Sequence, residues 1–360
     1  MTKELLTLLR LGLENSFPED ENLSDFIVLS ADKWIQLEDV AQKQGVLGIA
    51  LDGIERLETT RYGLTKQLPI EQKLDWIGQV MMIEQANQHQ KKVMNELAAK
   101  WNQEGCRVMV MKGQANGILY PKPEHRSTGD IDCYLFEDYA RGNTIARNFG
   151  ANVDEGWYKH SQIVFKEELF ENHQYFVHTR QGKKSKRLQE ELEQALDVDK
   201  WNCFPGSKVL LPPVQWNAMF LTYHACAHFV SEGLLLKQLL DWAMFIKAAE
   251  YKIDWPAFYD FCERYNYRRF VDAVTTISVN SLGVKLTNPD IVINSAYSDR
   301  ILQSVFDESY IISRNGGWGE RIQIVKNLFY NKWKYEEICQ QSIWKQLWWY
   351  ASGYLLRTEN

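Results

Sequence analysis

The sequence predicts an α+β protein in which a small mixed β-sheet lies between two helical regions. Three observations support this prediction. Apolar residues recur with helical spacing over roughly the first hundred residues and again after Leu211. Short apolar runs of strand type are concentrated between Cys106 and about residue 180. With 45% apolar and 24% charged residues, the composition is that of a folded globular protein.

The first predicted domain, residues 1–104, is helical. Its last segment, from about Glu71 to Glu104, is expected to form one long helix that Gly105 ends, because glycine is frequent just past a helix end. The side chains expected along its buried side are Leu74, Ile77, Met81, Val93, Leu97 and Trp101.

The second predicted domain, residues 105–180, holds the sheet. The runs CRVMVM (residues 106–111) and DIDCYLF (residues 130–136) read as two buried strands, each followed by a short helix. Two or three further strands are expected between residue 151 and residue 180. The third predicted domain, residues 181–360, is helical again. At roughly 100–200 residues per domain, a chain of 360 residues has room for this arrangement.

Charge and cysteine content exclude several classes of protein. The net charge is −6, whereas a protein that binds nucleic acid over a wide surface is basic, so we expect no general nucleic-acid binding. The segment Val214–Ser231 lies in the longest stretch without a formal charge, residues 209–231, but it contains two histidines and other polar residues, so it reads as a buried helix and not a membrane span. The six cysteines have irregular spacing and read as reduced thiols. We therefore expect a cytoplasmic protein that does not enter the membrane.

Asp130 and Asp132 are the first candidates for a functional site. They open an apolar strand at alternate positions, so their side chains share one face. Two carboxylates placed in this way can hold a divalent cation, and oxygen ligands suit Mg²⁺ or Mn²⁺. Gly129, directly before them, allows a substrate to approach closely. We expect Asp132 to lie in an open, charged cleft without a packing role; the alternative is a pair of solvated acids at a strand end.

Lys112 and Gly113 follow the first strand and precede a short helix. A glycine at such a turn exposes backbone N–H groups that can bind phosphate, and Lys112 can reach the same phosphates. The alternative is an ordinary turn glycine beside a surface lysine. Arg126, four residues before Asp130, could bind a triphosphate through two N–H groups.

Glu171 and His173 share one face of a later strand. If that strand lies next to the strand of Asp132, the Glu171 carboxylate should come within about 4–5 Å of the Asp132 carboxylate, close enough to share a cation. Three acids around a pair of metal ions are what nucleotidyl transfer requires. The alternative is that Glu171 is an exposed acid at the edge of the sheet.

The ordered set of motifs resembles the uncharacterised nucleotidyltransferase family of the DNA polymerase β-like superfamily. The motifs are Lys112–Gly113, Arg126 to Asp132, Glu171–His173, Leu211–Pro213, His224, and Lys237 with Asp241. The resemblance covers most of residues 35–245. It implies a small nucleotidyltransferase core flanked by helical domains. It also implies transfer of a nucleoside monophosphate from an NTP, with ATP expected, in a reaction that depends on Mg²⁺ or Mn²⁺.

The resemblance also assigns roles to individual residues. It makes Asp130 and Asp132 metal ligands and Glu171 the third carboxylate. The residues that it places near the nucleotide or the acceptor are Lys112, Gly113, Arg126, Gly129, Lys237 and Asp241. The chain departs from better-studied members of the superfamily because Gln114 follows the turn glycine in place of serine or glycine.

Two further features have competing interpretations. His224 and His228 are four residues apart on a predicted helix, and we expect them to be buried or to line the cleft rather than to bind zinc, since no third ligand is evident. Lys237 and Asp241 can instead form an ordinary ion pair across one helical turn. For the whole chain, the alternative to an enzyme is a degenerate domain that binds a nucleotide or a partner without turnover.

Overall fold

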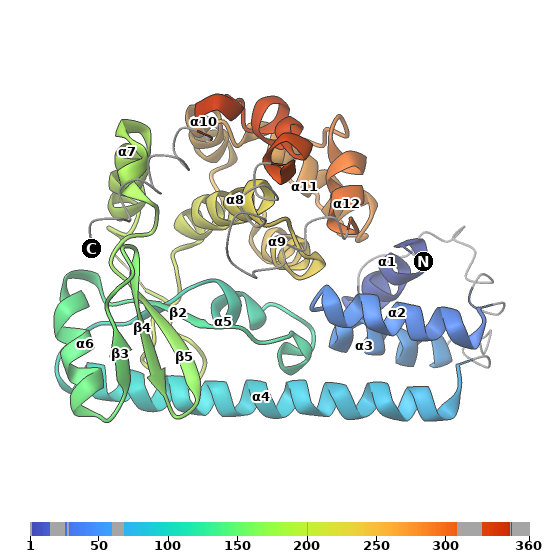
Figure 1. Cartoon of the computed structure of the whole chain (residues 1–360), viewed down its shortest axis with the longest axis horizontal. Helices are drawn as coiled ribbons and strands as arrows, with labels where there is room; N and C mark the ends of the chain where they lie inside the picture. Colours follow the sequence, from blue (N-terminus) through green and yellow to red (C-terminus); the bar gives the residue numbers. More distant parts are fainter. Residues whose placement is uncertain are drawn as a thin grey trace.

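The computed structural model of the chain describes residues 2–14, 26, 29–59, 68–199, 201–307, 326–345 and 347. Within this part of the chain, a five-stranded mixed sheet is combined with many helices, which confirms the predicted α+β class. One long helix runs along one side of the molecule, with the sheet at one of its ends and the first helices of the chain at the other (Figure 1).

The long helix is α4, Ile70–Gln103, and it agrees with the predicted helix from Glu71 to Glu104. It ends before Gly105, whose φ of +81° is a conformation that glycine adopts without steric cost. Figure 1 shows α1 (Thr2–Gly12), α2 (Ala31–Lys43) and α3 (Leu47–Thr59) above its first half.

The predicted buried side of α4 is partly wrong. Leu74 is 60% exposed and Met81 is 52% exposed, whereas Trp76 and Trp101 are fully buried. An α-helix turns by about 100° per residue, so Leu74 and Met81 lie on the side opposite Trp101. The Trp76 side chain faces α3, where its indole N–H donates to the Leu47 carbonyl oxygen at 3.1 Å.

The sheet has the strand order β1-β2-β5-β4-β3. Its strands are β1 (Met109–Val110), β2 (Ile131–Tyr134), β3 (Asn152–Asp154), β4 (His160–Phe165) and β5 (Glu168–His173). Neighbouring strands are antiparallel except β2 and β5, which are parallel. The strands β1 and β2 are shorter than predicted, so Asp130 lies just before β2 and only Asp132 is part of it.

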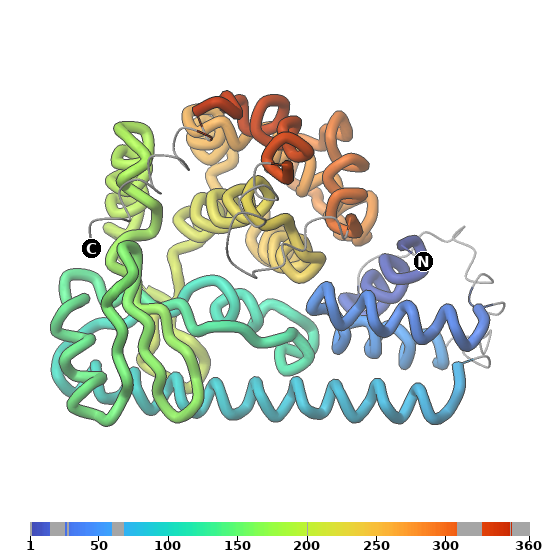
Figure 2. Tube along the Cα trace, in the orientation of Figure 1, coloured from blue at the N-terminus to red at the C-terminus, as the bar shows by residue number. Residues whose placement is uncertain are grey.

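Two short helices follow the first two strands, as the sequence predicts: α5 (Lys112–Gly117) and α6 (Tyr139–Asn148). The later helices are α7 (Lys183–Gln194), α8 (Val214–Ser231), α9 (Leu236–Ala249), α10 (Trp255–Tyr265), α11 (Arg268–Asn280) and α12 (Ser298–Val305). In the trace of Figure 2, α8 and α9 lie between α5 and the helices α10–α12.

The described residues form two main hydrophobic cores. One lies between the sheet, the C-terminal half of α4 and α6, and there the Trp101 ring meets the Phe170 ring edge-on at 6.1 Å. The other hydrophobic core extends from the first helices, where it includes Trp34 of α2, to α8–α11, where it includes Phe258 of α10. The helices of the first and third predicted domains therefore share apolar packing, and the domain boundaries after residues 104 and 180 stay a prediction.

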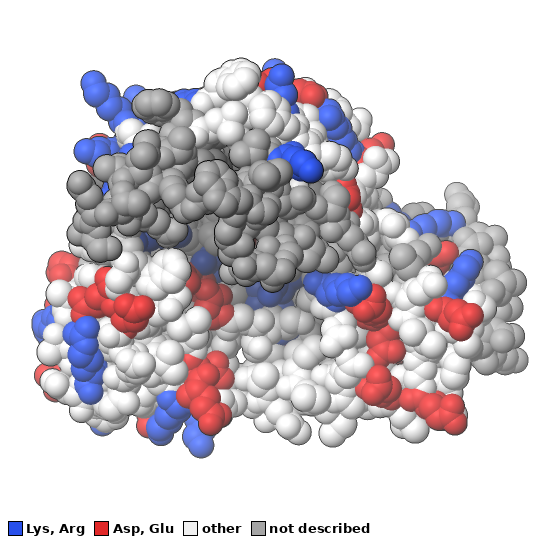
Figure 3. Space-filling model, viewed as in Figure 1, with Lys and Arg blue, Asp and Glu red and all other residues white. Residues whose placement is uncertain are grey.

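Among the described helices, none is long and apolar enough to cross a membrane. On the face shown in Figure 3, acidic and basic side chains are interspersed, and basic side chains are also seen in the hollow between the two halves of the molecule.

The loop before Arg126 is attached to α3 and α4 through His125. The His125 ring is buried. Its Nδ1 lies 2.9 Å from an Asp52 oxygen of α3, and its Nε2 lies 2.9 Å from a Glu84 oxygen of α4. Lys122, in the same loop as His125, also contacts Asp52. Burial alone lowers the pKa of His125, but Asp52 and Glu84 outweigh burial and raise it above the ordinary value.

This arrangement makes the stability of the protein depend on pH. The pKa of His125 is higher in the folded chain than in the unfolded chain, so the protonated ring stabilises the folded chain fully below about pH 6.5, the ordinary pKa of histidine. This stabilisation is lost as the pH rises through the pKa that His125 has in the folded chain. We expect His125→Gln to cost about 2 kcal/mol at pH 6 and much less at pH 9, because hydrogen bonds to charged groups contribute about 1.5–3 kcal/mol. Thermal unfolding at both pH values tests this, with the exposed His89→Gln as control; equal losses at both pH values would contradict it.

Candidate functional site

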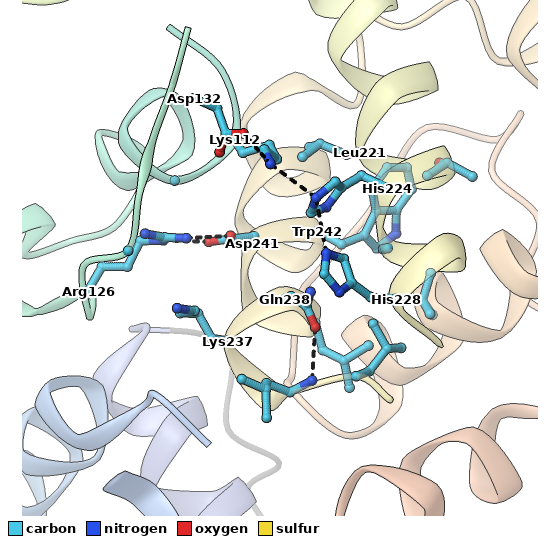
Figure 4. A pocket seen from close by; sticks show the side chains of 18 of the residues that line it. Lys112, Arg126, Asp132, Leu221, His224, His228, Lys237, Gln238, Asp241 and Trp242 are labelled. Carbon is cyan, nitrogen blue, oxygen red and sulfur yellow. Dashed lines mark hydrogen bonds and ion pairs between the residues drawn. The ribbon is translucent and has the colours of Figure 1, made fainter. Parts of the chain in front are cut away.

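A pocket of about 410 Å³ lies where the sheet and α5 face α8 and α9. Asp130 and Asp132 line it from the side of the sheet, and Lys237 and Asp241 line it from α9 (Figure 4). The pocket therefore brings together residues from two parts of the chain that are about a hundred positions apart.

Three carboxylates converge at the sheet side of this site. Because β2 and β5 are parallel with Asp132 opposite Glu171, both side chains project from the same face, and Asp130 precedes them at the strand end. One oxygen atom from each of Asp130, Asp132 and Glu171 lies within 4.8 Å of the other two. The proximity expected between Glu171 and Asp132 is therefore found, and Glu171 is not an exposed acid at the sheet edge.

The neighbours of Glu171 in β5 point to the other face of the sheet. Phe170 packs on Trp101 in the core, and the Asn172 amide donates to the Asn143 side-chain oxygen of α6 at 2.8 Å. A shift of β5 by one residue would bury Glu171 in this core. The apolar packing therefore fixes the register of β5 against β2 that places Glu171 opposite Asp132.

The expectation that Asp132 lies in an open cleft is wrong. Asp132 is only 3% exposed, and its carboxylate contacts the Lys112 ammonium and lies 2.8 Å from Nε2 of His173. Burial by itself raises the pKa of Asp132, but the charges and hydrogen bonds of Lys112 and His173 lower it far below the usual range. Asp130, by contrast, is exposed as a whole residue, but its carboxyl group is partly shielded from solvent by the neighbouring protein. This partial desolvation and the charge of Asp132 raise its pKa.

Lys112 and Gly113 lie at the start of α5, directly after β1, as predicted. Lys112 has a φ of +49° and reaches both Asp132 and His224, whose Nε2 lies 3.1 Å from its ammonium nitrogen. At Gly113 a Cβ atom would lie 3.3 Å from a guanidinium nitrogen of Arg126, so the absent side chain leaves room for Arg126. Gln114, the residue after this glycine, turns to α4 and donates to the Gln90 side chain.

The guanidinium group of Arg126, predicted to be able to bind a triphosphate, is paired with a carboxylate of the protein. Its Nε and Nη2 donate to the two carboxylate oxygens of Asp241 at 2.8 and 2.7 Å, and the Tyr120 hydroxyl donates to the same carboxylate at 2.8 Å. The bidentate contact predicted for a triphosphate is thus made with Asp241, and Asp241 pairs with Arg126 rather than with Lys237 (Figure 4). Contacts of Arg126 and Asp241 with the nucleotide stay a prediction.

Lys237 lies one helical turn before Asp241 and lines the same pocket (Figure 4). Burial and the positive charge of Arg126 lower the pKa of its ammonium group. A bound anion would relieve this repulsion; the place of Lys237 near a phosphate or an acceptor stays a prediction.

Two polar side chains of α4 were missed by the sequence analysis. Asn87 Nδ2 donates to the Arg126 carbonyl oxygen at 2.8 Å, and Gln90 Nε2 donates to the Gly129 carbonyl oxygen at 2.6 Å. They hold the loop that carries Arg126 and Asp130 against the long helix. Gln90 is 2% exposed and lies one turn before Val93 and Met94, so a polar residue on the core side of the helix was the available signal.

His224 and His228 line the pocket from α8 with their Nε2 atoms 3.2 Å apart (Figure 4). Burial first, and then the charge of Lys112, lower the pKa of His224 well below its ordinary value, so the ring is neutral. In the part of the chain that the structure describes, neither histidine belongs to a group of three possible metal ligands. His224 and His228 therefore line the cleft, which is the interpretation that the sequence favours over a zinc site.

The sequence matches a known protein family. The sequence model of a family described as uncharacterised nucleotidyltransferase matches residues 30–283, which is more than half of the chain and includes every residue of the site. No curated protein and no solved structure matches the chain.

The Arg126–Asp241 pair should be a strong contributor to stability. We expect Asp241→Asn to lower the free energy of unfolding by about 3–5 kcal/mol, because it leaves a buried guanidinium without its counter-charge. Urea unfolding tests this, with the exposed Asp260→Asn of α10 as the matched control. In the double variant Arg126→Met/Asp241→Asn much of the loss should be recovered. An unchanged stability of Asp241→Asn would mean that the pair contributes little.

Proposed function

Because the chain belongs to the uncharacterised nucleotidyltransferase family, we propose that it transfers a nucleoside monophosphate from an NTP to an acceptor hydroxyl or similar group. The observation that carries this proposal is the convergence of Asp130, Asp132 and Glu171 within 4.8 Å beside a pocket that also contains basic side chains. In the reaction, a bond forms between the acceptor oxygen and the α-phosphorus of the NTP. The bond from that phosphorus to the bridging oxygen breaks, and pyrophosphate leaves.

The three carboxylates fit a divalent cation. Their donor atoms are oxygens, the ligands that Mg²⁺ and Mn²⁺ prefer. Their negative charges repel one another, which is one cause of the raised pKa of Asp130. Among the described residues, Lys112 forms an ion pair with Asp132 but not with Asp130 or Glu171. When bound, a divalent cation neutralises the charge that develops on the phosphates and lowers the pKa of the attacking hydroxyl. We propose Asp130, Asp132 and Glu171 as its ligands.

The other residues of the site bind and orient the substrates in this proposal. Lys112 and the backbone at Gly113 bind phosphate oxygens, with Gly129 leaving space for the close approach of the nucleotide. Lys237, on the opposite wall, supplies a second positive charge for a phosphate or the acceptor. Arg126 and Asp241 fix the loop before Asp130 against α9, so they position the acids.

Glu171 is also the proposed proton acceptor. Burial raises its pKa, but the hydrogen bond from His173 and the charge of Lys112 outweigh burial and lower it, so the carboxylate is ionised. It can therefore take the proton from the acceptor hydroxyl as the new bond to phosphorus forms.

Asp130→Asn is the sharpest test of the reaction, because Asp130 is exposed and its loss does not uncover a buried partner. We expect at least about a hundredfold loss of label transfer from α-labelled NTP with Mg²⁺, since a metal-bound transition state loses one charged ligand. The assay uses a mixture of small-molecule extracts as acceptors. Asp154→Asn, at an exposed aspartate of β3, should keep wild-type transfer. Equal activity of Asp130→Asn and wild type would contradict the assignment of the metal site.

Binding of NTP should require a divalent cation, because the carboxylates otherwise repel the triphosphate. Calorimetric titration with ATP and with the other NTPs, in Mg²⁺ and then in EDTA, should show at least about a tenfold weaker affinity in EDTA. Equal affinity in both buffers would argue against a cation between the acids and the phosphates. Tight binding in Mg²⁺ without transfer to any acceptor would instead support the alternative, a binding domain without turnover.

A further inference from the structure

A second group of possible metal ligands lies on the same face of the sheet as the three carboxylates. It consists of His160, Glu171 and His173, and one ligand atom of each lies within 4.8 Å of the other two. In the antiparallel pair of β4 and β5, His160 lies directly opposite His173, and Glu171 is two residues before His173. The pleat of the sheet therefore directs the three side chains to one side.

The distances within this group are those of ligands around a small cation. His160 Nε2 lies 3.3 Å from one Glu171 oxygen, and His173 Nε2 lies 3.5 Å from the other. Two ligands bound at about 2.1 Å to a tetrahedral ion are about 3.4 Å apart, and two adjacent ligands of an octahedral ion are about 3.0 Å apart. The Asp132 carboxylate can provide a fourth donor, although its oxygen that lies 2.8 Å from His173 Nε2 also contacts the Lys112 ammonium.

The hydrogen bonding of His160 favours a ligand at this position. Both ring nitrogens of His160 are buried, and neither has a hydrogen-bond partner among the described residues. Buried polar atoms are nearly always satisfied, so an imidazole that forms no hydrogen bond, although its Nε2 lies 3.3 Å from Glu171, indicates a missing partner. The side chains of His160 and Glu171 are 13% and 16% exposed, so a small ion can reach them.

The ring of His173 is also oriented as in a metal ligand. Its Nδ1 lies 3.3 Å from the Tyr175 carbonyl oxygen, so Nδ1 can carry the ring proton when a cation replaces the proton that Nε2 donates to Asp132 in the metal-free chain. Histidines that bind metals commonly donate their second nitrogen to a backbone carbonyl in this way. The competing interpretation is that His173 only donates to Asp132 and orients it.

We propose that His160, His173 and Glu171, with Asp132, bind a first-row transition-metal ion such as Mn²⁺, Co²⁺ or Zn²⁺. Two imidazole nitrogens favour such ions over Mg²⁺, which prefers oxygen ligands alone. Glu171 has two carboxylate oxygens, so it can bridge this ion and the cation proposed for the three acids. The inference uses the site of the proposed function but does not require that the chain transfers nucleotides.

The test is pulsed electron paramagnetic resonance of the full chain with Mn²⁺ alone, without nucleotide. We expect spin-echo modulation from directly bound ¹⁴N, which a site of carboxylates alone cannot give, and we expect it to persist in excess Mg²⁺. His160→Gln should reduce the modulation and weaken Mn²⁺ binding at least about tenfold. His89→Gln, an exposed histidine of α4, should change neither.

The same measurement separates this inference from the proposed reaction. Asp130→Asn should keep the nitrogen modulation although it loses transfer, because Asp130 belongs only to the carboxylate group. A wild-type spectrum without nitrogen modulation would overturn the inference, even if His160→Gln does not fold. Unchanged modulation and affinity in a folded His160→Gln would overturn it as well, whatever the transfer assay shows.

Discussion

The buried negative charge of Asp132 is the constraint on which the rest of the site depends. A carboxylate that is 3% exposed costs several kcal/mol unless opposite charges and hydrogen bonds compensate it. Here the compensation comes from two elements, with Lys112 at the start of α5 and His173 at the end of β5. Lys112 in turn contacts His224 of α8. The charge of one strand residue therefore sets the relative positions of the sheet, α5 and α8.

The ion pair of Arg126 with Asp241 is the second charged contact between the two walls of the pocket, and it differs from the contacts of Asp132 in its effect on the charge available to a substrate. Arg126 and Asp241 satisfy each other in a bidentate pair, so they leave little charge for a substrate, whereas Lys237 beside them keeps a destabilised positive charge. The site thus separates two tasks. A closed ion pair holds the loop before Asp130, and the side chains at the pocket surface remain available for phosphate or acceptor groups.

The sequence was sufficient for the class of fold and for the strand that follows Asp130, because alternation along strands is a local property. The proximity of Glu171 could be predicted only on the condition that its strand lies next to that of Asp132, since the pairing of β2 with β5 joins segments about 40 positions apart. The sequence was not sufficient for the partners of Arg126 and Asp241, since an arginine near an acidic motif looks the same whether it meets a phosphate or a carboxylate. It also failed for α4, where an error in helical phase placed Leu74 and Met81 on the wrong side. His160 carries no local motif at all, and only the pairing of β4 with β5 brings it to the acids.

The spacing of these contacts along the chain has a consequence for the order of folding. Asp132 meets Lys112 and His173 within 41 positions, so the acidic half of the site can form once the sheet has been synthesised. The contacts of Lys112 with His224 and of Arg126 with Asp241 span 112 and 115 positions, and they must wait for α8 and α9. Closing such long loops is slow, and domains form as they emerge from the ribosome. During synthesis, Arg126 is thus without its counter-charge for about a hundred residues of elongation, and the pocket is the last part of the site to form.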